Sequence, residues 1–168
     1  MSNNNYHKIG NAPLFHVFLS TGFGTGFIPV APGTAGALVA LAIWYLLYLI
    51  LPISVLTLVT CFLIIGTIAT GVWTSNVMER YWGKDPRAVN IDEFVGTWIP
   101  LLIAPNGEST WLLAIFGFAS FRIIDILKPL GCKVLDEKCE GGWGVMLDDV
   151  LAGFYALMLT LCLKMTMF

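Results

Sequence analysis

Two adjacent acids, Asp148 and Asp149, lie inside the apolar stretch GGWGVMLDDVLAGFYALML, residues 141–159. A carboxylate that is removed from water must be paired, protonated or bound to a metal ion. Helix capping explains a single Asp at a helix start, because its side chain accepts hydrogen bonds from free N–H groups. It does not explain two neighbouring acids with apolar residues on both sides, so the pair predicts a functional site.

Three further acids lie at the ends of other apolar runs. Asp92 and Glu93 precede one run, and capping of a helix start explains this pair as well as a site does. Asp125 lies near the end of another run, where a negative charge meets the unfavourable end of the helix dipole. Arg122, three residues earlier on the same helical face, is its predicted partner. A structural ion pair accounts for Asp125 alone as well as a site does.

Together the five acids outnumber the two cations nearest to them in the sequence, Arg122 and Lys128. A hard divalent cation would balance the excess charge, and Mg²⁺ takes oxygen ligands while keeping water and substrate phosphate in its shell. We therefore predict a Mg²⁺ site, and the apolar surroundings predict that its phosphate-bearing substrate is a lipid. The predicted metal ligands are Asp92, Glu93, Asp125, Asp148 and Asp149.

A glycine-rich segment, STGFGTGFIPVAPGTAGAL, occupies residues 20–38. Its bare backbone N–H groups and two threonine hydroxyls could bind an anion just before a helix that begins near Pro32. The segment lacks the Gly-Lys-Ser/Thr ending of a nucleotide-binding loop, and close packing of small residues in a membrane bundle explains it equally well. The candidate substrate-binding residues are Thr25, Gly26, Gly33, Thr34, Arg122 and Lys128.

The composition indicates a membrane protein of one domain. Of the 168 residues, 57% are hydrophobic and 12% are charged, and the mean hydropathy is +0.80. Soluble domains carry about 25% charged residues, so this chain has about half the usual charge. The formal net charge of −2 and the lack of a basic run argue against a nucleic-acid partner. Residues 1–20 are predicted to form a polar N-terminal extension without the pattern of a secretory signal.

Five apolar segments predict the helices. Residues 36–51 and 53–73 are near-continuous runs that predict a transmembrane hairpin. Residues 94–104 and 111–124 are short for a full crossing, so they form either tilted helices or a hairpin packed inside the bundle. A final helix is expected over residues 145–163. The predicted fold is all-α: a compact membrane bundle of four to five apolar helices with polar cytoplasmic loops.

The basic residues predict the orientation. Most of them lie in the N-terminus and in two long polar segments, residues 79–93 and 127–144, whereas the turns around Pro52 and Asn106 contain none. Because positive residues favour the cytoplasmic side, the N-terminus, both polar segments and the acids are expected there. Lys164 alone falls near the opposite side, where one snorkelling lysine is tolerable.

Four motifs, in this order and spacing, resemble those of the phosphatidylglycerophosphatase A family. They are GFGTGFIPVAPGTAGAL, DEFVG, FRIIDILKP and GGWGVMLDDVLAG, and they extend over residues 22–153. The resemblance implies a compactly helical, Mg²⁺-dependent enzyme of the bacterial inner membrane, with membrane lipid as its partner. Its expected reaction removes phosphate from phosphatidylglycerophosphate to give phosphatidylglycerol. Nothing in the sequence predicts the oligomeric state.

The resemblance also assigns roles by position. Asp136 falls at an additional acidic position, although its polar neighbours also fit a solvated surface role. Glu140 departs from the family pattern, since a histidine is expected there in some relatives. The residues given catalytic roles are Asp92, Glu93, Arg122, Asp125 and Asp149, and Asp148, Lys128, Pro129 and Gly96 also match.

Metal-assisted hydrolysis is the predicted mechanism, because the signatures of other phosphatases are missing. Cys132 is not followed by the arginine of a Cys-x5-Arg motif, and no Asp-x-Asp occurs. The predicted nucleophile is a metal-activated water, and direct attack by an aspartate is the alternative. Arg122 and Lys128 would offset the charge of the transition state.

Two other functions compete with this prediction. A CDP-alcohol phosphatidyltransferase also gathers aspartates and Mg²⁺ at a membrane surface, but its Asp-x2-Asp-Gly-x2-Ala-Arg motif is missing. A small cation transporter subunit would place acids near the middle of the bilayer, whereas these acids are predicted at its boundary.

Overall fold

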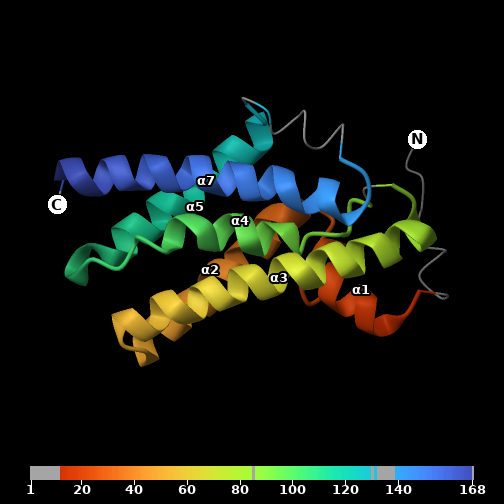
Figure 1. Ribbon diagram of the computed structural model, residues 1–168, viewed down its shortest axis with the longest axis horizontal. Coiled ribbons are helices and arrows are strands. Elements are labelled where there is room, and N and C mark those ends of the chain that lie inside the picture. Colours follow the sequence, from red (N-terminus) through yellow and green to blue (C-terminus); the bar gives the residue numbers. More distant parts are fainter. Residues whose placement is uncertain (1–11, 85, 130, 132–138, 168) are drawn as a thin grey trace.

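A computed structural model describes residues 12–84, 86–129, 131 and 139–167 (Figure 1). These residues contain six α-helices and no strand, which confirms the predicted all-α fold. Two 3-10 turns, η2 (Thr25–Phe27) and η3 (Gly107–Ser109), lie in the connections. The helices are α1 (Leu14–Ser20), α2 (Pro32–Ile50), α3 (Ile53–Trp82), α4 (Asp92–Leu101), α5 (Thr110–Leu127) and α7 (Gly142–Met167).

Four helical segments are long and apolar enough to cross a membrane: α2, α3, α5 together with η3, and α7. The 19 residues of α2 give a length of about 29 Å, which matches the hydrocarbon core of a bilayer. Large apolar side chains are exposed along these helices, among them Leu46, Phe62, Ile115 and Met158. The predicted membrane bundle is therefore confirmed.

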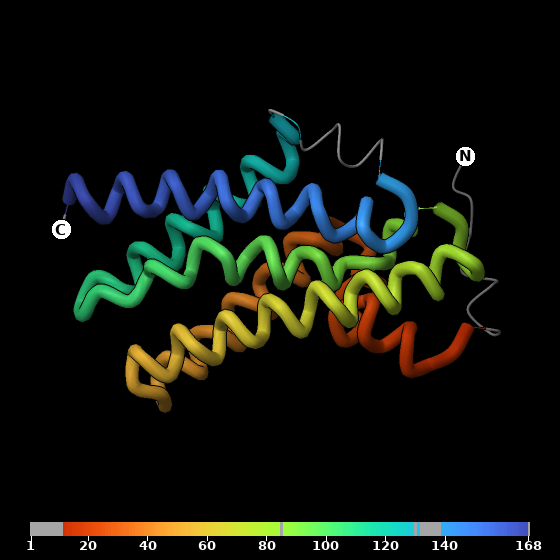
Figure 2. The backbone as a smooth tube through the Cα atoms, viewed as in Figure 1, coloured from red at the N-terminus to blue at the C-terminus, as the bar shows by residue number. Residues whose placement is uncertain are grey.

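The two short apolar arms have different structures. α5 with η3 is long enough to cross, whereas α4 has 10 residues and lies in the centre of the bundle (Figure 2). Every α4 residue from Glu93 to Leu101 is buried, and the helix packs against α2, α3, α5 and α7. Packing inside the bundle is thus the correct alternative for α4 alone.

Glycines let α4 approach its neighbours closely. A Cβ at Gly96 would lie 2.1 Å from the Phe121 ring of α5, and one at Gly153 of α7 would lie 3.0 Å from the carbonyl oxygen of Gly96. Trp98 Nε1 donates a hydrogen bond of 2.9 Å to the Ala40 carbonyl oxygen of α2. These contacts fix the start of α4, and the acids there, relative to three other helices.

α3 is longer than the apolar run that predicted it, because the helix continues through residues 74–82. Trp73 lies about 30 Å beyond Ile53, which is the thickness of the hydrocarbon core. Its side chain is about half exposed, as is typical of tryptophan at a membrane–water boundary. The last turns of α3 extend past this level toward the end at which α4 and α7 begin (Figure 1).

At the opposite end of the bundle, Lys164 of α7 binds backbone carbonyls. Its Nζ donates hydrogen bonds of 2.9 and 3.1 Å to the carbonyl oxygens of Ile103 and Pro105, between α4 and α5. The isolated lysine therefore ties the last helix to this turn, in addition to any snorkelling toward water.

Part of the N-terminal segment is a helix rather than a polar extension. α1 has the sequence LFHVFLS, contains no charged residue and packs against α3. The prediction of a polar extension over residues 1–20 overlooked this apolar stretch because it is too short to register as a membrane span.

Candidate active site

Three helix ends bring the predicted acids to one end of the bundle. α4 and α7 begin where α5 ends, so acids that are distant in the sequence share one level (Figure 1). They are Asp92 and Glu93 in the first turn of α4, Asp125 in the last turn of α5, and Asp148 and Asp149 in the second turn of α7.

Asp125, Asp148 and Asp149 form the densest part of the cluster. One carboxylate oxygen from each lies within 4.8 Å of those of the other two. Asp148 and Asp149 are only 6% and 2% exposed, so two neighbouring carboxyl groups are buried together. Burial and mutual repulsion both oppose this arrangement unless a cation or protons balance it.

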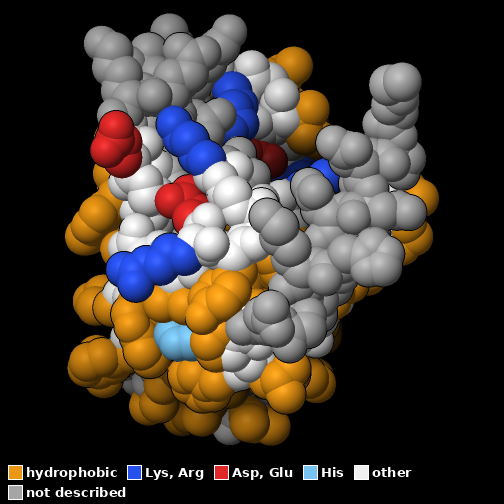
Figure 3. Space-filling model, turned by 90° about the vertical axis from the view of Figure 1, so that its right-hand side faces the viewer, with side chains coloured by type: hydrophobic (Ala, Val, Ile, Leu, Met, Phe, Trp, Pro, Cys, Tyr) orange, Lys and Arg blue, Asp and Glu red, His pale blue; other side chains and the backbone are white. Residues whose placement is uncertain are grey.

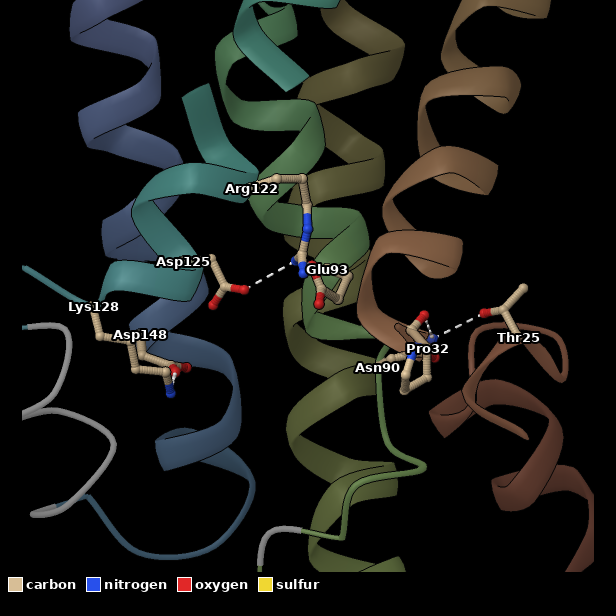
Figure 4. Close-up of polar contacts among 8 residues, drawn as sticks. All are labelled: Thr25, Pro32, Asn90, Glu93, Arg122, Asp125, Lys128 and Asp148. Carbon is tan, nitrogen blue, oxygen red and sulfur yellow. Dashed lines mark hydrogen bonds and ion pairs between the residues drawn. The ribbon is translucent and has the colours of Figure 1, made fainter. Parts of the chain in front are cut away.

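Arg122 connects acids from two helices (Figure 4). Its Nη1 donates a hydrogen bond of 3.0 Å to Asp125 Oδ2 within α5, and the same nitrogen forms an ion pair with Glu93 Oε2 of α4. Arg122 Nε is buried and has no hydrogen-bond partner among the described residues. The guanidinium is therefore held in place by the two acids and retains further N–H donors for another acceptor.

Burial changes the protonation of the two acids at the start of α4. It raises the pKa of Glu93 to about 7, against the opposing effect of Arg122. It also raises the pKa of Asp92 well above the usual range, and the nearby negative charges of Glu93, Asp148 and Asp125 act in the same direction. The Asp92 carboxyl therefore belongs to the same cluster as the acids of α5 and α7.

Lys128 pairs with Asp148. The Nζ–Oδ2 distance is 2.7 Å, and Figure 4 shows this pair beside Asp125. Lys128 is the C-cap of α5, with a φ of 44° in the left-handed region that few residues other than glycine adopt. The helix thus ends at a residue whose side chain offsets the charge of one acid on α7.

The donor set fits a hard divalent cation. Asp92 Oδ1 and Asp149 Oδ2 are buried oxygens without hydrogen-bond partners in the described part of the chain. Carboxylate oxygens alone, as in the Asp125, Asp148 and Asp149 group, suit Mg²⁺ rather than a softer metal. The predicted ligands therefore lie together, although Glu93 is also engaged by Arg122.

The acids lie just inside the level of Trp73. A Cβ at Gly71 would be 2.4 Å from Met146 Sδ of α7 and 3.4 Å from Ile91, which immediately precedes α4. Asp149 follows Met146 by about one helical turn. The cluster is therefore close to the level of Trp73 along the bundle.

Comparison with known proteins places the chain in a family. Residues 18–164 match the family model described as phosphatidylglycerophosphatase A. The chain belongs to this family. Membership makes the protein a phosphatase of lipid metabolism and confirms the resemblance seen in the four motifs.

Three relatives of this phosphatidylglycerophosphatase A family member are similar over most of their lengths. The Escherichia coli and Haemophilus influenzae proteins named phosphatidylglycerophosphatase A are 38% identical over 136 residues and 36% identical over 165 residues. These matches cover 80% of this chain and 75% of the first protein, and 96% of both chains for the second. A Bacteroides thetaiotaomicron protein named as a candidate phosphatidylinositol-3-phosphatase is 50% identical over 143 residues, covering 85% of this chain and 89% of that protein. No solved structure matches the chain.

Only part of the glycine-rich segment reaches the acids in this family member. A Cβ at Gly33, in the first turn of α2, would lie 1.9 Å from Glu93 Oε1 and 3.2 Å from Arg122 Nη2. Thr34 follows it and is half-buried. The first turn of α2, with its free N–H groups, therefore abuts the ion pair.

Thr25 and Gly26 contribute to packing instead. Thr25 Oγ1 donates to two carbonyl oxygens of its own segment and accepts a hydrogen bond from Asn90, which separates it from the acids in Figure 4. A Cβ at Gly26 would lie 1.9 Å from the Ala88 carbonyl oxygen. Their predicted contact with substrate therefore has less support than that of Gly33.

Asn90 is a residue near the site that sequence reasoning missed. Its Nδ2 donates hydrogen bonds of 2.9 Å to Thr25 Oγ1 and 3.0 Å to the Pro32 carbonyl oxygen, and its backbone N–H donates to Ser20. It is 2% exposed. Asn90 thus ties the glycine-rich segment to the start of α4, through contacts that no local pattern in the sequence signals.

The family resemblance singled out two further positions, Asp136 and Glu140, and neither is among the clustered acids that the structure describes. Asp136 lies outside the described residues, and Glu140 is exposed. An open hollow of about 660 Å³ on α3 contains none of the predicted site residues, so it does not define the site. It is lined by Trp73, Asn76, Val77, Glu79 and Arg80.

Proposed function

We propose that this chain hydrolyses phosphatidylglycerophosphate to phosphatidylglycerol and phosphate in a Mg²⁺-dependent reaction. The observation that carries the proposal is the group of Asp125, Asp148 and Asp149 at the end of an apolar bundle, beside the partly buried guanidinium of Arg122. Clustered acids suit a divalent cation, and an arginine suits a phosphate group. Two relatives named phosphatidylglycerophosphatase A support the substrate.

The acids would divide into metal ligands and a base. Asp125, Asp148 and Asp149 would hold Mg²⁺, with Asp92 as a further ligand through its buried Oδ1. When bound, Mg²⁺ would polarise the phosphoryl oxygens and lower the pKa of a bound water. Lys128 would orient Asp148 through their ion pair.

Glu93 is the proposed general base. A pKa of about 7 lets it accept a proton near neutral pH, and its ion pair with Arg122 fixes its position. Arg122 would bind the phosphoryl group through its remaining donors. Glu93→Gln should then lower kcat, because the amide cannot accept a proton.

We infer that the chain forms one membrane-embedded domain over residues 1–168 in the bacterial inner membrane, with the site facing the cytoplasm. Figure 3 shows Lys and Arg side chains on the end of the molecule where the acids lie. Arg80, Lys84 and Arg87 are exposed, whereas Lys164 lies at the other end. Positive residues favour the cytoplasmic side.

A phosphatidylinositol 3-phosphate is the second candidate substrate, because the relative named for that activity is 50% identical to this chain. Both lipids carry a phosphate monoester on a headgroup joined to diacylglycerol. The acids and Arg122 would act on either one, so the headgroup contacts decide between them.

Phosphate release from each lipid in detergent micelles tests the proposal. We expect release from phosphatidylglycerophosphate that EDTA abolishes and added Mg²⁺ restores. Faster release from phosphatidylinositol 3-phosphate would show that this lipid is the preferred substrate, while the proposed phosphatase reaction would stand. Release that is insensitive to EDTA would contradict the metal site.

A further inference from the structure

α1 presents an apolar face on its outer side. Leu14, Phe15 and Phe18 are 79%, 60% and 54% exposed, whereas Val17 and Ser20 are buried against the bundle. We name the exposed face, Leu14, Phe15 and Phe18, the α1 surface. The helix has 7 residues and a length of about 10 Å, so it cannot cross a bilayer.

The α1 surface is poorly suited to water. α1 has no charged residue, and its three most exposed side chains, Leu14, Phe15 and Phe18, are all apolar. A surface helix normally turns charged or polar side chains outward, so an apolar outer face is normally covered by protein or lipid. In Figure 3, hydrophobic side chains cover the lower half of the end face, where α1 lies in Figure 1. A contiguous apolar patch of this kind indicates a covering partner.

The α1 surface continues the lipid-facing surface of α3. The ring centroid of Phe15 lies 6.3 Å from that of Trp73, and the His16 ring lies 4.6 Å from it in a T-shaped contact. Trp73 is 52% exposed and lies about one hydrocarbon thickness beyond the start of α3. Phe15 is therefore at the level where α3 passes from hydrocarbon to headgroups.

We propose that the α1 surface lies in the boundary layer of the bilayer, between headgroups and hydrocarbon, at the end that contains the acids. Leucine and phenylalanine side chains suit this layer. The exposed cations Arg80, in the last turn of α3, and Lys84, just after it, suit anionic headgroups. The occupant of the surface is lipid, and the proposal is independent of which lipid is hydrolysed.

This contact brings lipid beside the segment that leads to the acids. The Phe18 ring lies 5.2 Å from that of Phe23, and the Phe23 ring lies 5.7 Å from that of Phe94, which follows Glu93. The three rings form a continuous row from the α1 surface to the start of α4. Insertion of the α1 surface would thus fix how deeply the glycine-rich segment lies in the bilayer.

Spin labelling tests the proposal. Phe18→Cys is introduced into a chain whose native cysteines are replaced by alanine, labelled with a nitroxide and reconstituted into phosphatidylcholine vesicles. The label's accessibility to oxygen, which concentrates in lipid, is compared with its accessibility to a water-soluble nickel complex. We expect a preference for oxygen, as for Phe62→Cys on the apolar part of α3, where Phe62 is 68% exposed. Arg87→Cys should prefer nickel.

Leu14→Cys provides a second label if Phe18→Cys does not fold. A preference for nickel at the α1 surface would overturn the proposal. Low accessibility to both reagents would also overturn it, because it would indicate that a second copy or another protein covers the surface. Phosphate release is measured on the same vesicles. An inactive protein whose labels prefer oxygen would contradict the proposed function and support the α1 surface.

Discussion

Gly33 at the start of α2 lies against Glu93 at the start of α4, so closely that a Cβ on Gly33 would be 1.9 Å from Glu93 Oε1. Glycine is required here because the neighbouring carboxylate leaves no room for a Cβ, and not because the backbone is left-handed. The contact also places the positive end of the α2 dipole next to a carboxylate, which is favourable. The position of the Glu93 carboxylate therefore depends on the absence of a side chain at residue 33.

Gly33→Ala should lower kcat/KM for phosphate release by about 10–100-fold, the usual effect of disturbing residues around a metal site. The fold should survive, because the new methyl group displaces only the end of the Glu93 side chain. Gly66→Ala is the matched control, since nothing lies within 4 Å of its new Cβ and alanine favours a helix by about 0.5–1 kcal/mol. Similar activity in both variants would show that catalysis does not depend on the position of the Glu93 carboxylate.

Asp149→Asn should lower Mg²⁺-dependent phosphate release by more than about 100-fold, because it deletes a buried carboxylate that we propose as a metal ligand. The protein should still insert and elute from size exclusion as the parent does. Glu140→Gln, at an exposed acid, should keep parental turnover. Near-parental turnover in Asp149→Asn would remove the basis of the metal site.

Arg122→Ala should lower turnover by about 10²–10³-fold, since it deletes the cation that would face the phosphoryl group. Mg²⁺ affinity should not fall, because the variant leaves Glu93 and Asp125 without their positive neighbour. Arg80→Ala, at an exposed position on α3, controls for a general loss of charge. Equal losses in the two variants would contradict the role of Arg122.

Mg²⁺ binding should weaken as the pH falls through about 7. The pKa of Glu93 is raised to about 7, and that of Asp92 is raised as well. Protonation of these carboxyls removes negative charge from the cluster, and this charge would attract the metal ion. The dissociation constant should rise by up to about 10-fold per pH unit for each proton released on binding. Titration with Mn²⁺ in the absence of lipid avoids the ionisation of the substrate phosphate. A constant affinity between pH 6 and 8 would argue against these pKa values.

Without metal, the same acids should make the protein less stable at higher pH. A carboxyl whose pKa is raised on folding binds more protons in the folded state, so the free energy of unfolding falls as the pH rises through that pKa. In EDTA, the Tm should be lower at pH 8 than at pH 6, and Mg²⁺ should raise it at pH 8. The opposite order in EDTA would mean that these acids do not control stability.

The sequence was sufficient for the features that depend on composition and on short patterns. Apolar runs predicted the long helices, and acids at the ends of three runs predicted that Asp125 and Asp149 would meet. This worked because Asp125 and Asp149 flank one connection, so the end of α5 and the start of α7 lie at the same level of the bundle.

Features that depend on tertiary packing were not predictable in the same way. The apolar pattern of residues 94–104 is the same for a lipid-facing helix and for one enclosed by protein, so it could not reveal that α4 is central. Asn90 reaches acceptors in Thr25 and Pro32, 65 and 58 residues away. Lys128 was expected near the substrate, and neither its left-handed backbone at the end of α5 nor its pairing with Asp148 is signalled by the local sequence.

The depth of the acids below Trp73 has a kinetic meaning. A phosphate group can reach a cluster about one helical turn inside the boundary while its acyl chains remain in the leaflet. An enzyme of this geometry need not extract its substrate into water. It would meet substrate by lateral diffusion, so its rate would depend on the number of substrate molecules per area of membrane.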